Sequence, residues 1–287
     1  MTASDPVRLR IDLAYDGTPF AGFSRQPDQH TVQGTLEGAL WRLLGVVDPT
    51  EGGRRGRMPA AGGVVAGLTV AGRTDRGVHA LGQVCHVDVR PLNHRAELAL
   101  GDLPRLQARL DQAAGRSVTI WSVTRVPSAF DARFSAVWRA YRYRIIDASR
   151  IEPLRHHDAW HVPEGPLALR AMQQAAKHLI GTHDYASFCR NRDGKTTMRR
   201  LDTTAVVRAA PGEVHLKFRG KAFCQQQVRA MVGALVEVGL GKRDPAWIAE
   251  LLAARSRKAA AAVAPAHGLT LEAVGYERPF PASPLGR

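Results

Sequence analysis

Cysteine is scarce in this 287-residue sequence, which contains only Cys85, Cys189 and Cys224. Their spacing is not that of paired ligands, so we expect neither a disulfide framework nor a zinc site. The eleven histidines also show no metal-ligand spacing. No apolar run approaches the length that spans a membrane, and the first ten residues lack the apolar core of a signal sequence. These absences favour a soluble protein of the reducing cytoplasm.

Acidic residues are few compared with basic ones. The 26 Asp and Glu residues stand against 40 Lys and Arg, which gives a formal net charge of +14. An excess of this size predicts a polyanionic partner, most often nucleic acid. The basic residues are mostly arginine, which binds phosphates and stacks on bases better than lysine does. A basic surface kept only for solubility is the alternative interpretation.

Hydrophobic periodicity predicts a mixture of strands and helices. Residues 7–15 alternate as a half-buried strand does, and residues 32–44 carry an apolar helical face between a capping Thr31 and a terminating Gly45. Further helices are predicted over 93–115 with a break near Pro104, over 167–180, and from Asp244, with Asp244 as the cap and Pro245 at the first position. Further strands are predicted over 118–126, 203–208, 214–219 and 268–276.

Pro127-Ser128 is a boundary signal that divides the chain into two halves of similar element order. We expect an N-terminal subdomain over 1–127, a C-terminal subdomain over 128–278 and a tail over 279–287. Residues 48–67 are rich in Gly, Arg, Ala and Pro and have the composition of an inserted loop.

The segment from Leu68 to Val89 organises the chain. Apolar residues at both ends predict one short strand arriving and another leaving, and the loop between them contains Arg73, Asp75 and Arg76 among glycines. The flanking arginines favour the ionised form of Asp75. An ionised carboxylate on a short loop at a sheet edge is a candidate nucleophile. The same residues also suit ordinary turn or capping chemistry, and local pattern alone does not decide between the two.

Four further blocks accompany this loop in order along the chain. The loop itself reads Gly72-Arg73-Thr74-Asp75, followed by Gly77-Val78-His79 and Gly82-Gln83-Val84. The other blocks are 20–33, 130–143, 222–233 and 268–276. Together they resemble the TruA family of tRNA pseudouridine synthases over nearly the whole chain. Five ordered blocks are more specific than any single short motif.

The resemblance implies an α+β fold with two similar subdomains, each an antiparallel sheet backed by helices, on either side of a central basic RNA-binding cleft. It implies isomerisation of uridine to pseudouridine in the anticodon stem–loop of tRNA, at positions 38–40. It also implies a homodimer that uses neither cofactor nor metal.

Site residues follow from the same resemblance. Asp75 matches the catalytic carboxylate, with Arg73 beside it, and Tyr141 matches the active-site tyrosine that stacks on the uracil. Arg229 would pair with Asp75, and Leu269 would pack under the base. A non-catalytic RNA-binding relative and a hydrolytic glycosidase are the alternatives, although the loop supplies no second carboxylate of the kind that glycosidases use.

Overall fold

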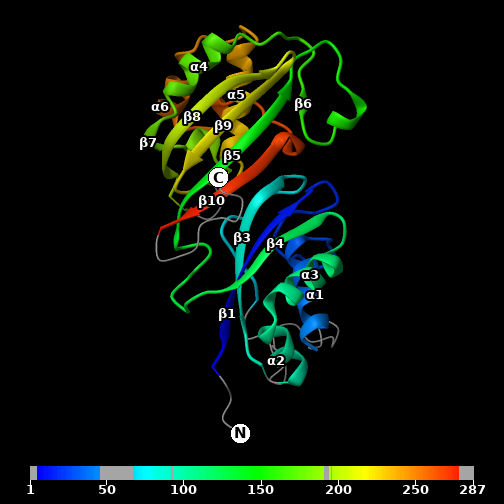
Figure 1. The fold of residues 1–287 in the computed structure, drawn as a ribbon. Coiled ribbons are helices and arrows are strands. Elements are labelled where there is room, and N and C mark those ends of the chain that lie inside the picture. Colours follow the sequence, from blue (N-terminus) through cyan, green and yellow to red (C-terminus); the bar gives the residue numbers. More distant parts are fainter. Residues whose placement is uncertain (1–4, 46–66, 92, 191–193, 195, 278–287) are drawn as a thin grey trace. The chain divides into compact units, whose positions relative to one another are not determined.

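The computed structural model describes residues 5–45, 67–91, 93–190, 194 and 196–277. The chain divides into two compact units (Figure 1). The first contains residues 1–137 and 273–287, and the second contains residues 138–272. The boundary near residue 127 stays a prediction about the domains. The insertion predicted over 48–67 lies outside the described residues except for Gly67, and the tail predicted over 279–287 lies outside them entirely.

Antiparallel strands form the sheet of the first unit. β1 (Val7–Tyr15) pairs on one side with β3 (His79–Val89) and on the other with β4 (Val118–Arg125). The short β2 (Thr69–Val70) adds to β3, which is followed in strand order by β10 (Leu269–Tyr276). Only the last part of β10, from Ala273, belongs to this unit.

The described part of the first unit contains three helices, and their ends follow the predicted signals. In α1 (Val32–Leu44), the Thr31 hydroxyl accepts a hydrogen bond from the Gly34 amide, and Gly45 ends the helix with a φ of 72°. The predicted break near Pro104 is confirmed, since α2 (His94–Gly101) ends before Asp102 caps α3 (Leu103–Ala114).

The burial of β1 differs from the prediction of a half-buried strand, because every residue from Leu9 to Tyr15 is buried. Two of these residues are charged. Arg10 and Asp12 form an ion pair with 2.7 Å between Nη2 and Oδ1, so the strand places its alternate, polar positions in a second buried layer. In the sequence, two charged residues at alternate positions look the same whether they face solvent or form a buried ion pair.

The second unit is built on β5 (Ala136–Ile146), whose first two residues belong to the first unit. β9 (Glu213–Gly220) pairs antiparallel with β5, β8 (Met198–Ala210) with β9, and β7 (Gly181–Asp184) with β8. The first part of β10 lies on the other side of β5. The short β6 (Trp160–His161) pairs in parallel with the last residues of β5.

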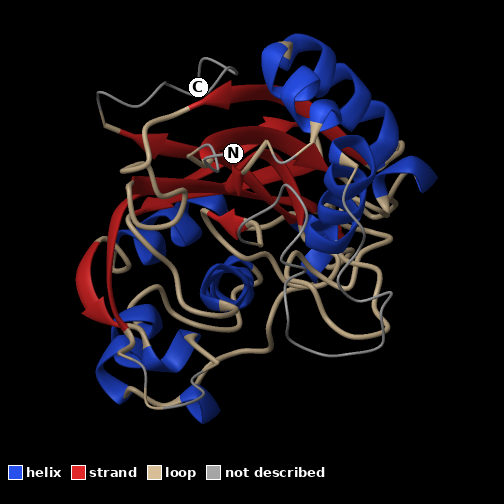
Figure 2. Cartoon of the chain, turned by 90° about the horizontal axis from the view of Figure 1, so that it is seen from below, coloured by secondary structure: helices blue, strands red, loops and turns tan. Residues whose placement is uncertain are grey.

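Helices α4 (Leu169–Lys177), α5 (Gln227–Gly239) and α6 (Trp247–Ala254) complete the second unit, and α4 contacts both β8 and α5. Short 3-10 helices span Pro153–Arg155, Ala186–Phe188, Arg257–Ala259 and Ala266–Gly268. Figure 2 distinguishes helices from strands by colour. The mixed α/β composition is therefore confirmed.

Three predicted boundaries are wrong by three residues or more. The helix predicted over 167–180 is α4, which already ends at Lys177. The helix expected from Asp244 begins at Trp247, because Asp244 instead caps a turn, its carboxylate accepting a hydrogen bond from the Ala246 amide. The strand expected from residue 203 begins at Met198, since β7 supplies a pairing partner for the residues before it. No helix in the described part of the chain is long and apolar enough to cross a membrane.

Candidate active site

The loop that carries Asp75 leaves β2 and enters β3, and its backbone is fixed at the first turn. The Ala71 amide donates to the Val84 carbonyl at 2.8 Å. Gln83, which is fully buried on β3, donates from Nε2 to the Gly72 carbonyl at 2.8 Å and to the Tyr15 hydroxyl at 3.2 Å. A buried amide with two partners holds the loop against the sheet edge.

Thr74, immediately before Asp75, is held on both sides. Its buried hydroxyl lies 2.7 Å from the Tyr15 hydroxyl, and its carbonyl accepts a hydrogen bond of 3.1 Å from the Phe23 amide. Gly22 permits this approach with a φ of 112°, and a Cβ at Gly22 would stand 3.1 Å from the Thr74 carbonyl oxygen. The position of Thr74, directly before Asp75, is therefore fixed by contacts of both its side chain and its backbone.

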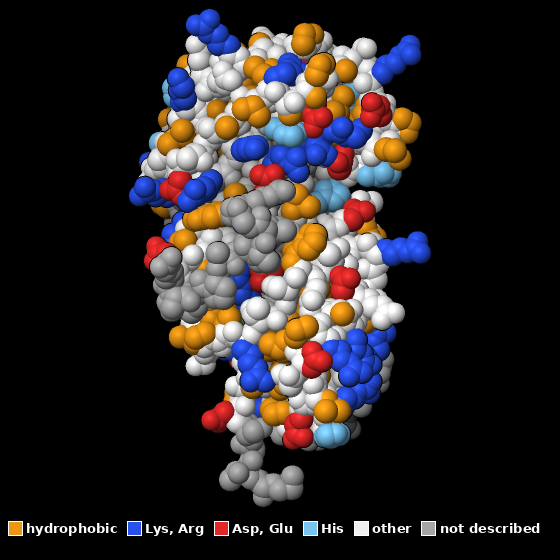
Figure 3. Space-filling model, in the orientation of Figure 1, with side chains coloured by type: hydrophobic (Ala, Val, Ile, Leu, Met, Phe, Trp, Pro, Cys, Tyr) orange, Lys and Arg blue, Asp and Glu red, His pale blue; other side chains and the backbone are white. Residues whose placement is uncertain are grey.

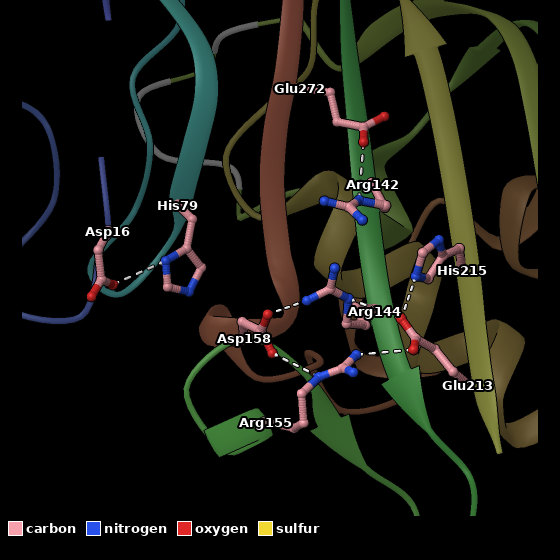
Figure 4. A network of polar contacts seen from close by, with 9 residues as sticks. All are labelled: Asp16, His79, Arg142, Arg144, Arg155, Asp158, Glu213, His215 and Glu272. Atoms are coloured by element: carbon pink, nitrogen blue, oxygen red, sulfur yellow. Dashed lines mark hydrogen bonds and ion pairs between the residues drawn. The ribbon is translucent and has the colours of Figure 1, made fainter. Parts of the chain in front are cut away.

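The turn at Asp16-Gly17 supports the other end of the loop. The Gly17 amide donates to Nδ1 of His79 at 3.1 Å, and the same nitrogen lies 3.1 Å from a carboxylate oxygen of Asp16 (Figure 4). Nδ1 accepts from the amide when it is unprotonated and pairs with Asp16 when it is protonated, so it serves one contact at a time. In either state His79 joins the turn to the start of β3.

Asp75 itself is partly exposed, and its carbonyl accepts a hydrogen bond of 3.2 Å from the Val78 amide. Arg73 and Arg76 on either side are exposed, and Arg76 donates to the Gln29 side chain at 3.0 Å. A fixed backbone with a solvent-accessible carboxylate between two cations suits attack on, or proton abstraction from, a bound anionic substrate.

The other predicted site residues belong to the second unit. Tyr141 on β5 is 8% exposed, and its ring meets that of Phe223 edge to face, with centroids 5.1 Å apart. Tyr143, two residues further along the same strand face, is fully buried, and its hydroxyl donates to the Pro265 carbonyl at 2.7 Å. Tyr143 is therefore a residue of the core.

Arg229 on α5 is joined to the segment before β10 by two hydrogen bonds. Its Nε donates to the Ala264 carbonyl at 2.8 Å, and the Ala264 amide donates back to the Arg229 carbonyl at 3.2 Å. Burial raises the pKa of Tyr143, and the charge of Arg229 acts on that pKa in the opposite direction. Arg229 is thus close enough to Tyr143 to affect its titration.

Leu269 is 6% exposed and begins β10 directly after Gly268. A Cβ at Gly268 would stand 2.6 Å from Cζ of Tyr143, so only glycine lets the backbone lie on this ring. Within the second unit, Arg229 and the glycine that precedes Leu269 therefore both lie near the buried ring of Tyr143.

Arg142 and Arg144 of β5 face a set of acidic partners (Figure 4), so their positive charge is largely neutralised within this unit. Burial alone would raise the pKa of Glu213, but hydrogen bonds from His215 and Arg155 bring it below its usual value. Lys and Arg gather on this unit among acidic side chains (Figure 3). The ion pairs are Arg142–Glu272 at 3.0 Å, Arg144–Glu213 at 3.1 Å, Arg155–Glu213 at 3.0 Å, Arg155–Asp158 at 3.5 Å, and Arg144–Asp158. His215 adds a hydrogen bond of 2.6 Å to Glu213, since burial lowers the pKa of its ring.

Comparison with known proteins identifies the family. Residues 175–277 match the family model described as tRNA pseudouridine synthase. A protein of Frankia casuarinae named tRNA pseudouridine synthase A is 48% identical over 271 residues, which cover 94% of this chain and 89% of that protein. Proteins of the same name from Streptomyces avermitilis and Halalkalibacterium halodurans are 44% and 36% identical, covering 94% and 91% of this chain and 88% and 90% of their own lengths. The chain belongs to the tRNA pseudouridine synthase A family.

One covalent feature of this tRNA pseudouridine synthase family member is not signalled by its sequence. Cys189 and Cys224 form a disulfide with Cα atoms 5.7 Å apart, contrary to the expectation of no disulfide. The two residues are 35 positions apart, and only the fold brings them together. The Arg190 amide donates to the Gln225 carbonyl at 3.0 Å beside the disulfide. No local spacing signals such a pair.

The supporting residues of the Asp75 loop were also missed as functional. Tyr15 appeared only as the end of a strand, and Gln83 only as part of the quoted motif. A polar residue inside an otherwise apolar run, as Gln83 is between Leu81 and Val84, is the signal that marks it in the sequence. No group of His, Cys, Asp and Glu among the described residues is arranged to hold a metal ion.

Proposed function

We propose that this chain isomerises uridine to pseudouridine in tRNA and that Asp75 is the catalytic carboxylate. The main observation in favour is the geometry of the Asp75 loop. Gln83, Thr74 and Gly17 hold its backbone by hydrogen bonds, while the Asp75 side chain stays accessible to solvent. Full-length similarity to proteins named tRNA pseudouridine synthase A supports the assignment.

The reaction breaks the bond between ribose C1′ and uracil N1, turns the base, and joins C1′ to C5. The C5 proton is then lost and N1 gains one, so the product is an isomer of the substrate. Asp75 attacks C1′, abstracts a sugar proton to give a glycal, or attacks C6 of the base. Each route needs an ionised carboxylate held in place before the base departs.

Four other residues serve the same site in this proposal. Tyr141 stacks on the uracil, and its hydroxyl is placed to take part in loss of the C5 proton. Arg229 pairs with Asp75, Arg73 binds substrate beside it, and Leu269 packs under the base. The hydrogen bonds of Arg229 to Ala264 and the packing of Gly268 on Tyr143 support defined positions for the residues of the second unit.

The substrate region proposed is the 3′ side of the anticodon stem–loop, positions 38–40, bound in a basic cleft flanked by two subdomains. A paired base must leave its stem to react, which costs a few kcal/mol that backbone contacts have to supply. The net charge of +14 supports such contacts. We also propose that the protein is a cytoplasmic homodimer. Sedimentation of the purified protein measures the size of the assembly.

The test uses tRNA transcripts labelled with tritium at uridine C5. Isomerisation releases the label without freeing uracil, a hydrolytic glycosidase frees uracil, and a non-catalytic binding protein does neither. We expect release of label with no free uracil. Binding without release overturns the proposed activity and favours the RNA-binding alternative.

A further inference from the structure

The segment between β4 and β5 in the first unit displays an aromatic side chain in water. Phe134 is 79% exposed and is the most exposed of the described aromatic residues. Single exposed apolar side chains are common on protein surfaces. Phe134 is distinguished from them by the hydrogen-bonded turn that carries it and by the cation over its ring.

The backbone beneath Phe134 is fixed by its neighbour Asp131. One carboxylate oxygen of Asp131 accepts hydrogen bonds of 2.8 Å from the amides of both Arg133 and Phe134. The Ser135 hydroxyl accepts from the Asp131 amide at 3.0 Å, and the Ser135 amide donates back to the Asp131 carbonyl at 2.9 Å. Four hydrogen bonds within five residues make this a rigid turn and not a loose loop.

The turn is also anchored to the core through Ala132. The Ala132 amide donates to Nδ1 of His86 at 3.0 Å, and the Tyr276 hydroxyl donates to the Ala132 carbonyl at 2.7 Å. Burial, together with the charge of Arg8, lowers the pKa of His86, which keeps Nδ1 available as an acceptor. The exposed ring of Phe134 is therefore carried by a turn that hydrogen bonds hold in place.

A cation accompanies the ring. The guanidinium carbon of Arg133 lies 5.2 Å from the centroid of Phe134, within cation–π range. The guanidinium lies over one face of the ring, and the other face together with this cation suits stacking on an unpaired base and binding of the adjoining phosphate. An apolar protein surface would instead require more apolar residues around Phe134. Ala132 of the same turn is buried, and the side chains that reach the surface beside Phe134 are those of Asp131, Arg133 and Ser135.

We propose that Arg133 and Phe134 form a stacking platform for tRNA, in which Phe134 stacks on an unpaired base and Arg133 binds the phosphate next to it. This proposal depends on the proposed function in one respect, namely that the ligand is tRNA. It adds a contact outside the Asp75 loop, on a turn whose geometry is set before the RNA arrives. Preorganisation of this kind spares the ordering cost of binding.

The test compares three variants of Phe134 with a matched control. Phe134→Ala removes the face, Phe134→Leu keeps an apolar side chain without a ring, and Phe134→Trp restores a ring. Leu98→Ala, at a position on α2 of the same unit that is 62% exposed, controls for loss of exposed apolar surface. Filter binding to unmodified tRNA transcript, single-turnover label release, melting temperature and sedimentation are measured for each.

Base–aromatic stacking predicts that Phe134→Ala and Phe134→Leu weaken tRNA binding by about 5- to 150-fold. Phe134→Trp should restore most of the affinity, and Leu98→Ala should match wild type. Unchanged affinity in Phe134→Ala, or full affinity in Phe134→Leu, overturns the platform. Loss of affinity that accompanies loss of the dimer also overturns it and makes Phe134 a contact between copies.

The two proposals fail separately in this design. Wild-type protein that binds tRNA but releases no label refutes the proposed activity, while the affinity ratios of the Phe134 variants still decide the platform. If wild type and Phe134→Ala bind tRNA with the same affinity and release label at the same rate, the platform is refuted and the proposed activity is not.

Discussion

Substitution of Gly17 by alanine tests whether the turn at Asp16-Gly17 positions the catalytic loop. Gly17 lies against Val78 so closely that an added Cβ would stand 2.5 Å from the Val78 carbonyl carbon and 2.9 Å from its nitrogen. Real Cβ atoms essentially never approach other heavy atoms within 3.0 Å. The two backbone segments must therefore move apart in the variant.

The size of the effect follows from these distances. Carbon atoms pack at about 3.5–4.0 Å, so Val78 must retreat by about 1 Å. The Val78 amide donates to the Asp75 carbonyl at 3.2 Å, which passes the displacement to Asp75. A misplacement of about 1 Å costs about 100-fold in rate, and overpacking costs about 1–3 kcal/mol of stability. Gly17→Ala should thus be folded, less stable and about 100-fold slower.

Single-turnover release of label from C5-tritiated tRNA measures the rate, and thermal unfolding measures stability. Gly38→Ala is the matched control, because a Cβ at this position of α1 meets nothing within 4 Å. It should keep the wild-type rate and gain about 1 kcal/mol of stability from helix propensity. A folded Gly17→Ala protein with the wild-type single-turnover rate would refute the positioning role of the turn.

Four further substitutions at three positions give separate expectations. Asp75→Asn keeps the shape and loses the charge, so it should bind tRNA normally and release no label; turnover by protein free of wild-type contamination contradicts the assignment. Tyr141→Phe should bind normally and fail to release the C5 proton, whereas Tyr141→Ala should also lose about 1–3 kcal/mol of stacking; full turnover in Tyr141→Ala removes Tyr141 from the site. Because the pKa of His86 is lowered in the folded protein, the unfolded chain binds that proton more readily, and stability is lost as pH falls below about 6.5. Melting temperature should therefore fall less steeply on acidification in His86→Asn, which keeps an acceptor without titrating, and parallel curves would contradict this.

The elements predicted best are those whose signals are local. α1 begins after Thr31 and ends at Gly45 because a hydroxyl caps its first amides and glycine accepts a left-handed φ. The Asp75 loop was located from glycines between two apolar runs, and β2 and β3 do flank it. Such features are determined by a few neighbouring residues, and sequence therefore reveals them.

Features that depend on tertiary contact were not predicted. Arg10 and Asp12 have the pattern of an exposed strand face, and their burial depends on partners that only the fold supplies. These partners are each other, the Ser122 hydroxyl, and the rings of Phe130 and Tyr276. The close approach of Gly17 to Val78 joins residues 61 positions apart, which no periodicity encodes. The Cys189–Cys224 disulfide is of the same kind. Sequence located the candidate carboxylate but not the contacts that hold its loop.

The route of β10 has a consequence for synthesis of the protein. The second unit is one continuous segment, residues 138–272, whereas the first unit needs residues from 273 onward. Until Tyr276 leaves the ribosome, the Ala132 carbonyl lacks its hydroxyl partner and Arg10 lacks one of its two aromatic neighbours. The half of the chain that is translated first is thus the half that finishes folding last, and a premature stop before residue 273 would leave the unit carrying Asp75 incomplete.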